Sequence, residues 1–250
     1  MSVPAGHVAR LAVEFWLRAG GAATYPRDPE PLLSLALPLA VRALPDLTAA
    51  RVRDLAALYG FPDLEASHER ALRGCLIAFS GRGMIIVDPR DPPPERRVTV
   101  AHELGHFLLE VMEPRRRVER SAGRAALAVL DGERPASFTE RLDAALAGAI
   151  LIPHLHLMAR NEDGSIGCAS VAAAECAADQ FALELLAPAA ALRDGVRALE
   201  DCPVEQRWAL VTERLILDFG LPVIVAGGYA RDLVRELTGG ATVRQWLGLS

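Results

Sequence analysis

The chain has 250 residues, enough for one or two domains with a hydrophobic core. Its 51% hydrophobic and 24% charged residues are typical of folded proteins and exclude general disorder. Four cysteines without a CxxC spacing exclude a disulfide-rich scaffold, and the net charge of −5 argues against a general nucleic-acid binder.

We expect neither a membrane segment nor an export signal from the residues of this sequence. The apolar run at residues 32–41 contains Ser34 and Pro38 and is too short to span a bilayer. Residues 8–18 carry charged side chains at helical spacing, which predicts an amphipathic helix rather than a signal peptide. We therefore expect a cytoplasmic protein with reduced cysteines and no contact with a membrane.

Two further helices are expected at residues 31–43 and 48–59, with Thr48 as a candidate N-cap of the second. Residues 74–88 form two apolar runs around a turn that contains glycine, which is the pattern of a β-hairpin. Residues 89–94 are rich in proline and predict a rigid loop.

The next helix is expected at residues 95–112, because Pro114 should end it. The basic run at 115–124 predicts a solvated surface segment.

The rest of the chain also has mostly helical periodicity. We expect helices at 139–151, 169–186 and 205–218, a short strand at 221–228, and a last helix at 229–237.

The main chemical signal is the sequence His-Glu-Leu-Gly-His at residues 102–106. Positions i and i+4 lie on one face of a helix, so His102 and His106 can direct their imidazoles at one metal ion. Glu103, one position further round, can reach a water at that metal and act as the general base without binding the metal. Neighbouring apolar residues predict that this helix is buried.

Two histidines leave a zinc site incomplete, so a third protein ligand is needed. Glu175 and Asp179 share one face of the helix at 169–186. Glu175 can bind the metal there, while Asp179 accepts a hydrogen bond from a ligand histidine. His154 and His156 are the alternative ligands, and either could instead stabilise an oxyanion.

Two segments carry a family resemblance. Residues 95–110 (ERRVTVAHELGHFLLE) and 175–188 (ECAADQFALELLAP) together resemble the ImmA/IrrE family of zinc-dependent metallopeptidases. The resemblance covers roughly residues 48–190. The spacing between His106 and Glu175 is longer than the family usually has, which suggests an insertion at 113–168.

The resemblance implies an α+β, zincin-like fold, in which a small twisted sheet packs on the HExxH helix. It implies His102, His106 and Glu175 as ligands of one Zn²⁺ per chain, with Glu103 as the general base. Mn²⁺ or Fe²⁺ could take the same ligands. The family's activity implies an endopeptidase whose substrate is a specific protein, often a helix-turn-helix repressor that controls stress-response or mobile-element genes. No direct binding of nucleic acid is expected.

Three regions are expected along the chain. Residues 1–47 would form an N-terminal helical region, 48–190 the peptidase core with its insertion, and 191–250 a C-terminal α/β segment packed on the core. A second functional reading is a zincin-fold module that sequesters a regulatory partner, in the manner of an antirepressor or antitoxin, without cutting it.

Overall fold

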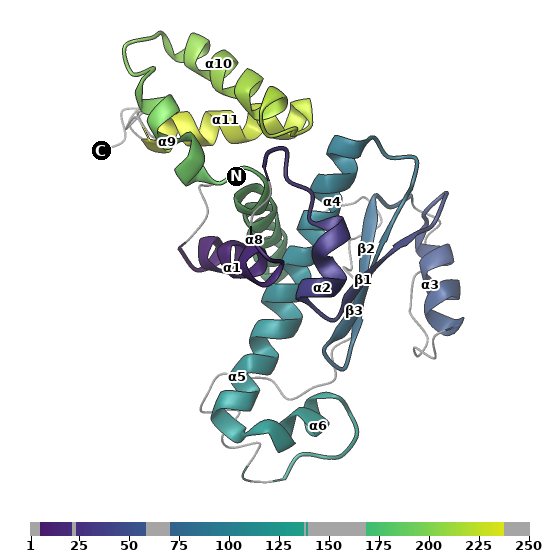
Figure 1. Cartoon of the computed structure of the whole chain (residues 1–250). Coiled ribbons are helices and arrows are strands. Elements are labelled where there is room, and N and C mark those ends of the chain that lie inside the picture. The colour runs from purple at the N-terminus through teal and green to yellow at the C-terminus, as the bar shows by residue number, and fades with distance from the viewer. Residues whose placement is uncertain (1–5, 22–23, 59–70, 138, 140–168, 238–250) are drawn as a thin grey trace.

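The computed structural model describes residues 6–21, 24–58, 71–137, 139 and 169–237 (Figure 1). Helices dominate, and three strands form one small sheet, so the predicted α+β composition is confirmed. No helix among the described residues is both long and apolar enough to cross a membrane. The elements are, in chain order, α1 (Gly6–Arg18), η1 (Glu30–Leu32), α2 (Leu33–Ala36), β1 (Leu39–Ala43), α3 (Ala49–Leu58), β2 (Gly74–Phe79), β3 (Arg82–Val87), α4 (Pro93–His106), η2 (Phe107–Met112), α5 (Glu113–Ala122), η3 (Arg124–Ala126), α6 (Leu127–Leu130), α8 (Ala169–Leu186), α9 (Ala189–Arg197), α10 (Val204–Leu217) and α11 (Val223–Leu237).

The sheet has the strand order β1-β3-β2. β2 and β3 pair antiparallel and form the predicted hairpin. Ser80 and Gly81 make its turn, and both have a positive φ (49° and 73°), as a tight two-residue hairpin turn requires. β1 pairs parallel to β3, with Leu39 opposite Gly83. Among the described residues, β2 therefore forms an edge of the sheet.

The prediction of one helix over 31–43 is wrong. Helical structure ends at Ala36, and Leu37 is extended, with φ −146° and ψ 157°. Leu37 precedes Pro38, and the proline ring disfavours helical geometry in the residue before it. The chain continues as strand β1. The N-terminal part of the chain thus contributes to the sheet as well as to the helical layer.

The sheet separates two hydrophobic clusters. The larger cluster joins one face of the sheet, through Leu76 and Ala78 of β2, to the buried side of α4, and it extends over α1, α8 and the C-terminal helices. The smaller cluster joins the other face, through Cys75 and Ile77, to α3. Alternate residues of β2 thus point into different clusters. Figure 1 shows α4 and α3 on opposite sides of the strands.

The helix that contains residues 102–106 does not end at Pro114. It passes from α4 through the π-helical stretch η2 into α5, which continues to Ala122. A proline inside an α-helix clashes with the carbonyl four residues earlier, which here belongs to Glu110. In the wider π-turn the backbone N–H of Glu113 instead reaches the carbonyl of Leu108. This geometry accommodates Pro114, and the basic run at 115–124 is therefore mostly helical.

The C-terminal part is helical in all its described elements, so the strand predicted at 221–228 is wrong. α11 begins directly after Pro222, whose carbonyl accepts the N–H of Ala226. Val223 and Ile224, which gave the strand-like pattern, are exposed. The apolar face of α11 lies further on and packs into the core. The boundaries of the three predicted regions stay a prediction.

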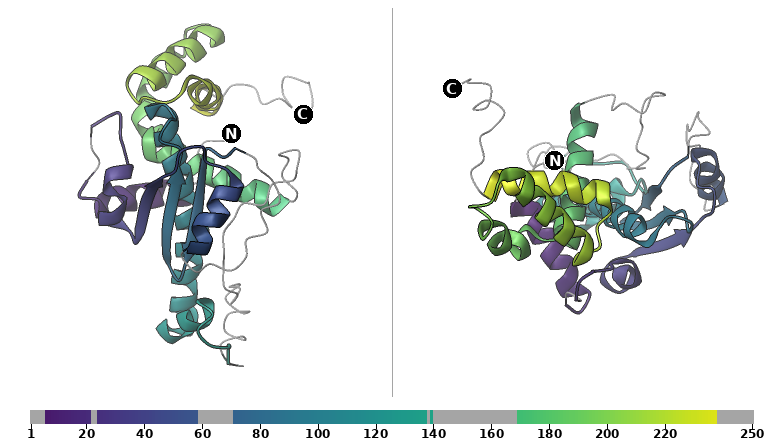
Figure 2. Two further views of the ribbon diagram at one scale, coloured as in Figure 1. Left: turned by 90° about the vertical axis from the view of Figure 1, so that its right-hand side faces the viewer. Right: turned by 90° about the horizontal axis from the view of Figure 1, so that it is seen from above.

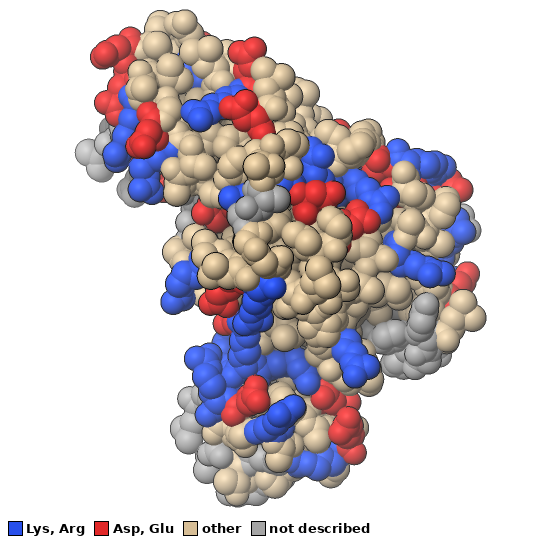
Figure 3. Space-filling model, in the orientation of Figure 1, with Lys and Arg blue, Asp and Glu red and all other residues tan. Residues whose placement is uncertain are grey.

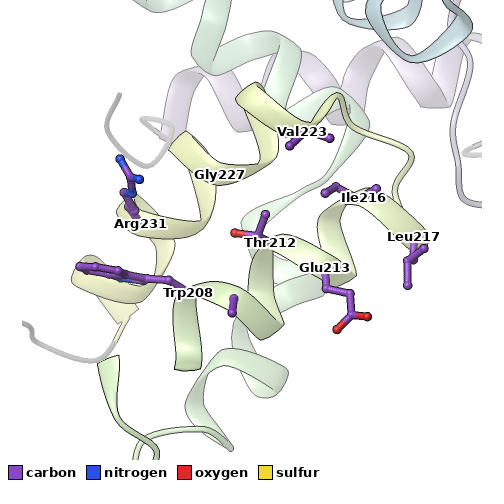
Figure 4. Close-up of a pocket in the computed structure, with 9 residues that line it drawn as sticks. Trp208, Thr212, Glu213, Ile216, Leu217, Val223, Gly227 and Arg231 are labelled. Atoms are coloured by element: carbon purple, nitrogen blue, oxygen red, sulfur yellow. The ribbon is translucent and has the colours of Figure 1, made fainter. Parts of the chain in front are cut away.

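α10 and α11 lie at one end of the molecule, and α5 and α6 lie at the other (Figures 1 and 2). The two C-terminal helices enclose a groove of about 490 Å³ (Figure 4). Its lining includes Trp208 and Ile216 of α10 and Val223 and Arg231 of α11. The groove contains none of the residues to which the sequence assigns chemistry.

Candidate metal centre

The His-Glu-Leu-Gly-His segment occupies the last turns of α4, deep in the larger cluster. Glu103 and His106 are buried, and the His102 side chain is 16% exposed. Leu104 fills the core on the opposite side of the helix. The apolar positions of α4 thus fix its orientation and turn the polar positions toward α8.

α4 and α8 approach each other closely at Gly105. A Cβ atom at this position would lie 3.0 Å from the Cα atom of Ala178 and 3.2 Å from its carbonyl oxygen. Such distances to a backbone leave no room for a larger side chain. The small residues Gly105 and Ala178 therefore let the two helix backbones meet, and this contact carries Glu175 and Asp179 to the histidines.

His102, His106 and Glu175 come together at one point. One possible ligand atom from each residue can be chosen so that all three lie within 4.8 Å of one another. The Nε2 atoms of the two histidines are 3.0 Å apart. The Oε2 atom of Glu175 is 3.5 Å from Nε2 of His102. Two elements far apart in the sequence thus supply the three groups.

Each histidine also contacts a carboxylate through its other ring nitrogen. Nδ1 of His102 lies 2.9 Å from Oδ1 of Asp179, and Nδ1 of His106 lies 2.5 Å from Oε1 of Glu110. A carboxylate at Nδ1 favours a proton on that nitrogen and leaves the lone pair of a neutral imidazole on Nε2. Both Nε2 lone pairs then point toward the same place as the Glu175 carboxylate.

This set of donor atoms fits a metal cation. Two imidazole lone pairs and a carboxylate repel one another unless a positive charge lies between them, and two His with one Glu is a ligand set that Zn²⁺ takes. The pKa of His102 points the same way. Burial lowers this pKa, but the hydrogen bonds to Asp179 and Glu175 and the charge of Glu103 outweigh burial and raise the pKa to about 10. The surroundings of His102 thus favour a positive charge.

Glu103 lies beside the first residue of β2. A Cβ atom at Gly74 would come within 3.2 Å of Oε1 of Glu103 and 2.3 Å of Cγ2 of Thr99. Glycine at position 74 thus allows the edge strand to approach the side chains of α4. The carboxylate of Glu103 is held between the helix that carries the histidines and the free edge of the sheet.

Sequence reasoning missed two residues of this site, Glu110 and Gly74. Glu110 lies four positions after His106, and this i,i+4 spacing was a usable signal. Gly74 carried no such signal, because its importance depends on the packing of β2 against α4. His154 and His156 fall outside the described residues, as does most of the suggested insertion.

One of three comparisons with known proteins gives a match. Residues 61–166 match the family model Peptidase_M78, described as the IrrE N-terminal-like domain. The chain contains a Peptidase_M78 domain. The match includes the hairpin and the His-Glu-Leu-Gly-His segment and stops before Glu175. Comparison with curated proteins gives no match, and comparison with solved structures gives none either.

The Peptidase_M78 domain agrees with the fold and with the resemblance to the ImmA/IrrE family. The three-stranded mixed sheet packed on the HExxH helix is the expected α+β, zincin-like arrangement. The matched family model is that of a peptidase domain, which indicates a hydrolase of the peptidase type. It also has a His-His-Glu group that can hold a metal ion.

Proposed function

We propose that this protein is a zinc-dependent endopeptidase that cleaves a specific intracellular protein. The observation that carries the proposal is the convergence of His102, His106 and Glu175, each histidine with a carboxylate at its second nitrogen. Together, the peptidase-family domain with its two histidines and buried Glu103, and Glu175 of α8, supply every residue that metal-assisted hydrolysis needs.

In this proposal His102, His106 and Glu175 hold the metal, while Asp179 and Glu110 orient the two imidazoles. Zinc, when bound, lowers the pKa of a coordinated water and polarises a peptide carbonyl. Glu103 accepts the proton of the attacking water and then delivers it to the leaving amine. Its buried carboxylate beside the metal ligands suits this transfer because bulk water competes little there.

The substrate would lie along the free edge of β2. An extended peptide can add a strand to an exposed sheet edge through main-chain hydrogen bonds. β2 begins at Gly74, next to Glu103, so a peptide bound to this edge would pass the general base. The absence of a side chain at Gly74 leaves Glu103 close to that path.

The substrate class follows from the family resemblance, which suggests a helix-turn-helix transcriptional repressor. Cleavage would remove the repressor and switch on the genes it controls. The proposal therefore assigns the protein a role in transcription regulation under stress, with a protein as partner and no direct contact with nucleic acid.

Replacing Glu103 by Gln tests the proposal. The full chain, loaded with zinc, is incubated with a library of peptides prepared from intracellular proteins, and new termini are identified by mass spectrometry. Loss of the general base should reduce cleavage by about 10²–10⁴-fold, while zinc content stays at the wild-type level. Glu205→Gln, an exposed change on α10, serves as the control. Wild-type cleavage rates in Glu103→Gln, or no cleavage by the zinc-loaded wild type, would contradict the proposal.

A further inference from the structure

The continuation of the HExxH helix forms an arm that projects from the body of the molecule. We define the basic arm as residues 113–130, which include α5, η3 and α6. The basic arm has five arginines and two glutamates, although the whole chain has a net charge of −5. Figure 3 shows arginine side chains gathered on the end of the molecule formed by α5 and α6.

The base of the basic arm packs against the turn of the β-hairpin through Arg115. Arg115 donates to both carboxylate oxygens of Asp131, with 3.0 Å for the second bond, and both side chains are largely buried. A Cβ atom at Gly81 would lie 2.6 Å from Nε of Arg115. Arg116 bonds to Glu113 at 2.7 Å. The close approach of Arg115 to Gly81 therefore joins the basic arm to the hairpin, while the two ion pairs hold the residues at the base of the arm together.

Three other arginines of the basic arm, unlike Arg115 and Arg116, face the solvent. Arg117, Arg120 and Arg124 are exposed, and no carboxylate among the described residues pairs with any of them. Arg117 and Arg120 lie one turn apart on α5, and Arg124 begins the next helical turn after Gly123. Elsewhere in the described chain, arginines such as Arg90 and Arg96 are neutralised by bidentate or multiple carboxylate contacts. The basic arm therefore offers a compact group of cations that can accept an acidic ligand.

The basic arm has a defined position relative to the candidate metal centre. Fourteen residues separate Glu103 from Arg117 along one helical run, about 20 Å at 1.5 Å per residue. β2 leads from Gly74, beside Glu103, to Phe79, which lines a small cleft with Arg115 and Asp131. An extended peptide covers about 20 Å with six residues. A substrate on the edge of β2 would thus reach the basic arm about six residues from the bond that is cut.

We propose that the basic arm is a substrate-binding surface for an acidic segment of the protein that the enzyme cleaves. This proposal rests on the endopeptidase function and names its selectivity. Arg117, Arg120 and Arg124 would pair with Asp or Glu side chains of the substrate, outside the cleft. A protein ligand is favoured over a nucleic acid because Glu113 and Glu119 interrupt the arginines, whereas specific DNA-binding surfaces neutralise many successive phosphates.

The test measures binding without cleavage. Fluorescence anisotropy follows a fluorescein-labelled ten-residue peptide rich in Asp and Glu, bound to the zinc-loaded full chain carrying Glu103→Gln. A peptide with Asn and Gln in place of the acids, and a 20-base-pair DNA duplex, are measured in parallel. The triple variant Arg117→Glu, Arg120→Glu, Arg124→Glu removes the proposed cations. The matched control Arg18→Glu, Arg42→Glu, Arg197→Glu makes the same change of charge at exposed arginines on α1, β1 and α9.

We expect the acidic peptide to bind more tightly than the neutral one and to lose about tenfold or more in affinity in the basic-arm variant. The control should stay within about twofold of the parent. The milder variant Arg117→Gln, Arg120→Gln should give a smaller loss in the same direction, which guards against misfolding of the triple variant.

Three results would overturn the proposal. They are equal binding of the acidic and neutral peptides, an equal loss in the control variant, and tighter binding of the DNA duplex through the same arginines. Because Glu103→Gln removes cleavage from the assay, a negative result here leaves the endopeptidase proposal intact. A failure of that proposal would appear instead in the wild-type cleavage experiment.

Discussion

α4 and α5 belong to one helical run, yet their surroundings are opposite. The second half of α4 is buried between the sheet and α8, and its polar residues converge on one another. α5 emerges from the body, and its polar residues face solvent or form ion pairs near its base. The π-helical stretch η2 joins the two halves.

Packing therefore determines where the side chains of α4 lie, whereas α5 presents charged side chains to the solvent. In α4 the contact between Gly105 and Ala178 determines which side chains meet, so a small change of volume should disturb the metal ligands. In α5 Arg115 and Val118 are packed against other residues, whereas Arg117 and Arg120 are exposed. Substitutions of these exposed arginines should affect recognition and leave stability nearly unchanged.

The largest effect should come from filling the contact between α4 and α8. Ala178→Leu adds three carbon atoms where two helix backbones already touch, and we expect a loss of about 1–3 kcal/mol in the free energy of unfolding, together with weaker metal binding. Ala172→Leu, on the exposed side of the same helix, should stay within about 0.5 kcal/mol of wild type. Urea unfolding of the metal-free chain measures the free energy of unfolding of both variants. Equal stabilities of the two variants would show that the helices can separate at no cost.

The next largest effect, on zinc affinity, is expected at the two carboxylates that contact Nδ1 of the histidines. Asp179→Asn and Glu110→Gln keep the shape of each side chain and remove its charge, so each should lower zinc affinity by about 10–100-fold. Competition with a chromophoric chelator measures this affinity, and Glu119→Gln is the control on α5. An unchanged affinity in Glu110→Gln would mean that the contact within the helix does not orient His106.

A smaller effect is expected at the base of the basic arm. Arg115→Gln leaves the largely buried Asp131 without its bidentate partner, which should cost about 1–2 kcal/mol of stability. The exposed double variant Arg117→Gln, Arg120→Gln on the same helix should cost less than about 0.5 kcal/mol. Thermal unfolding compares the two. Equal shifts of the midpoint would remove the distinction between the base and the surface of the basic arm.

The buried half of this helical run was largely predictable from the sequence. The i,i+4 histidines and the helical period of 169–186 are local patterns, and α8 has the predicted bounds. The role of Gly105 and Ala178 in bringing Glu175 to the histidines could only be suspected, because it depends on contact between helices more than seventy positions apart.

The wrong predictions of secondary structure have local and long-range causes. Pro38 was a visible sign that a helix should end at residue 36, but pairing of β1 with β3 could not be read from either segment alone. Short apolar runs such as 221–228 fit a strand or a helix equally well, and tertiary packing decides between them. The predicted helix end before Pro114 was wrong because a π-helical stretch can accommodate a proline that a regular α-helix cannot.

The central claim is that His102, His106 and Glu175 hold one metal ion, and metal content tests it most directly. Elemental analysis of the tag-free full chain, loaded with zinc and freed of excess, should give about one zinc per chain. Glu175→Gln should lose most of it, and the exposed change Glu205→Gln should lose none. A wild-type chain that retains no metal, or a Glu175→Gln variant that retains it in full, would contradict the account.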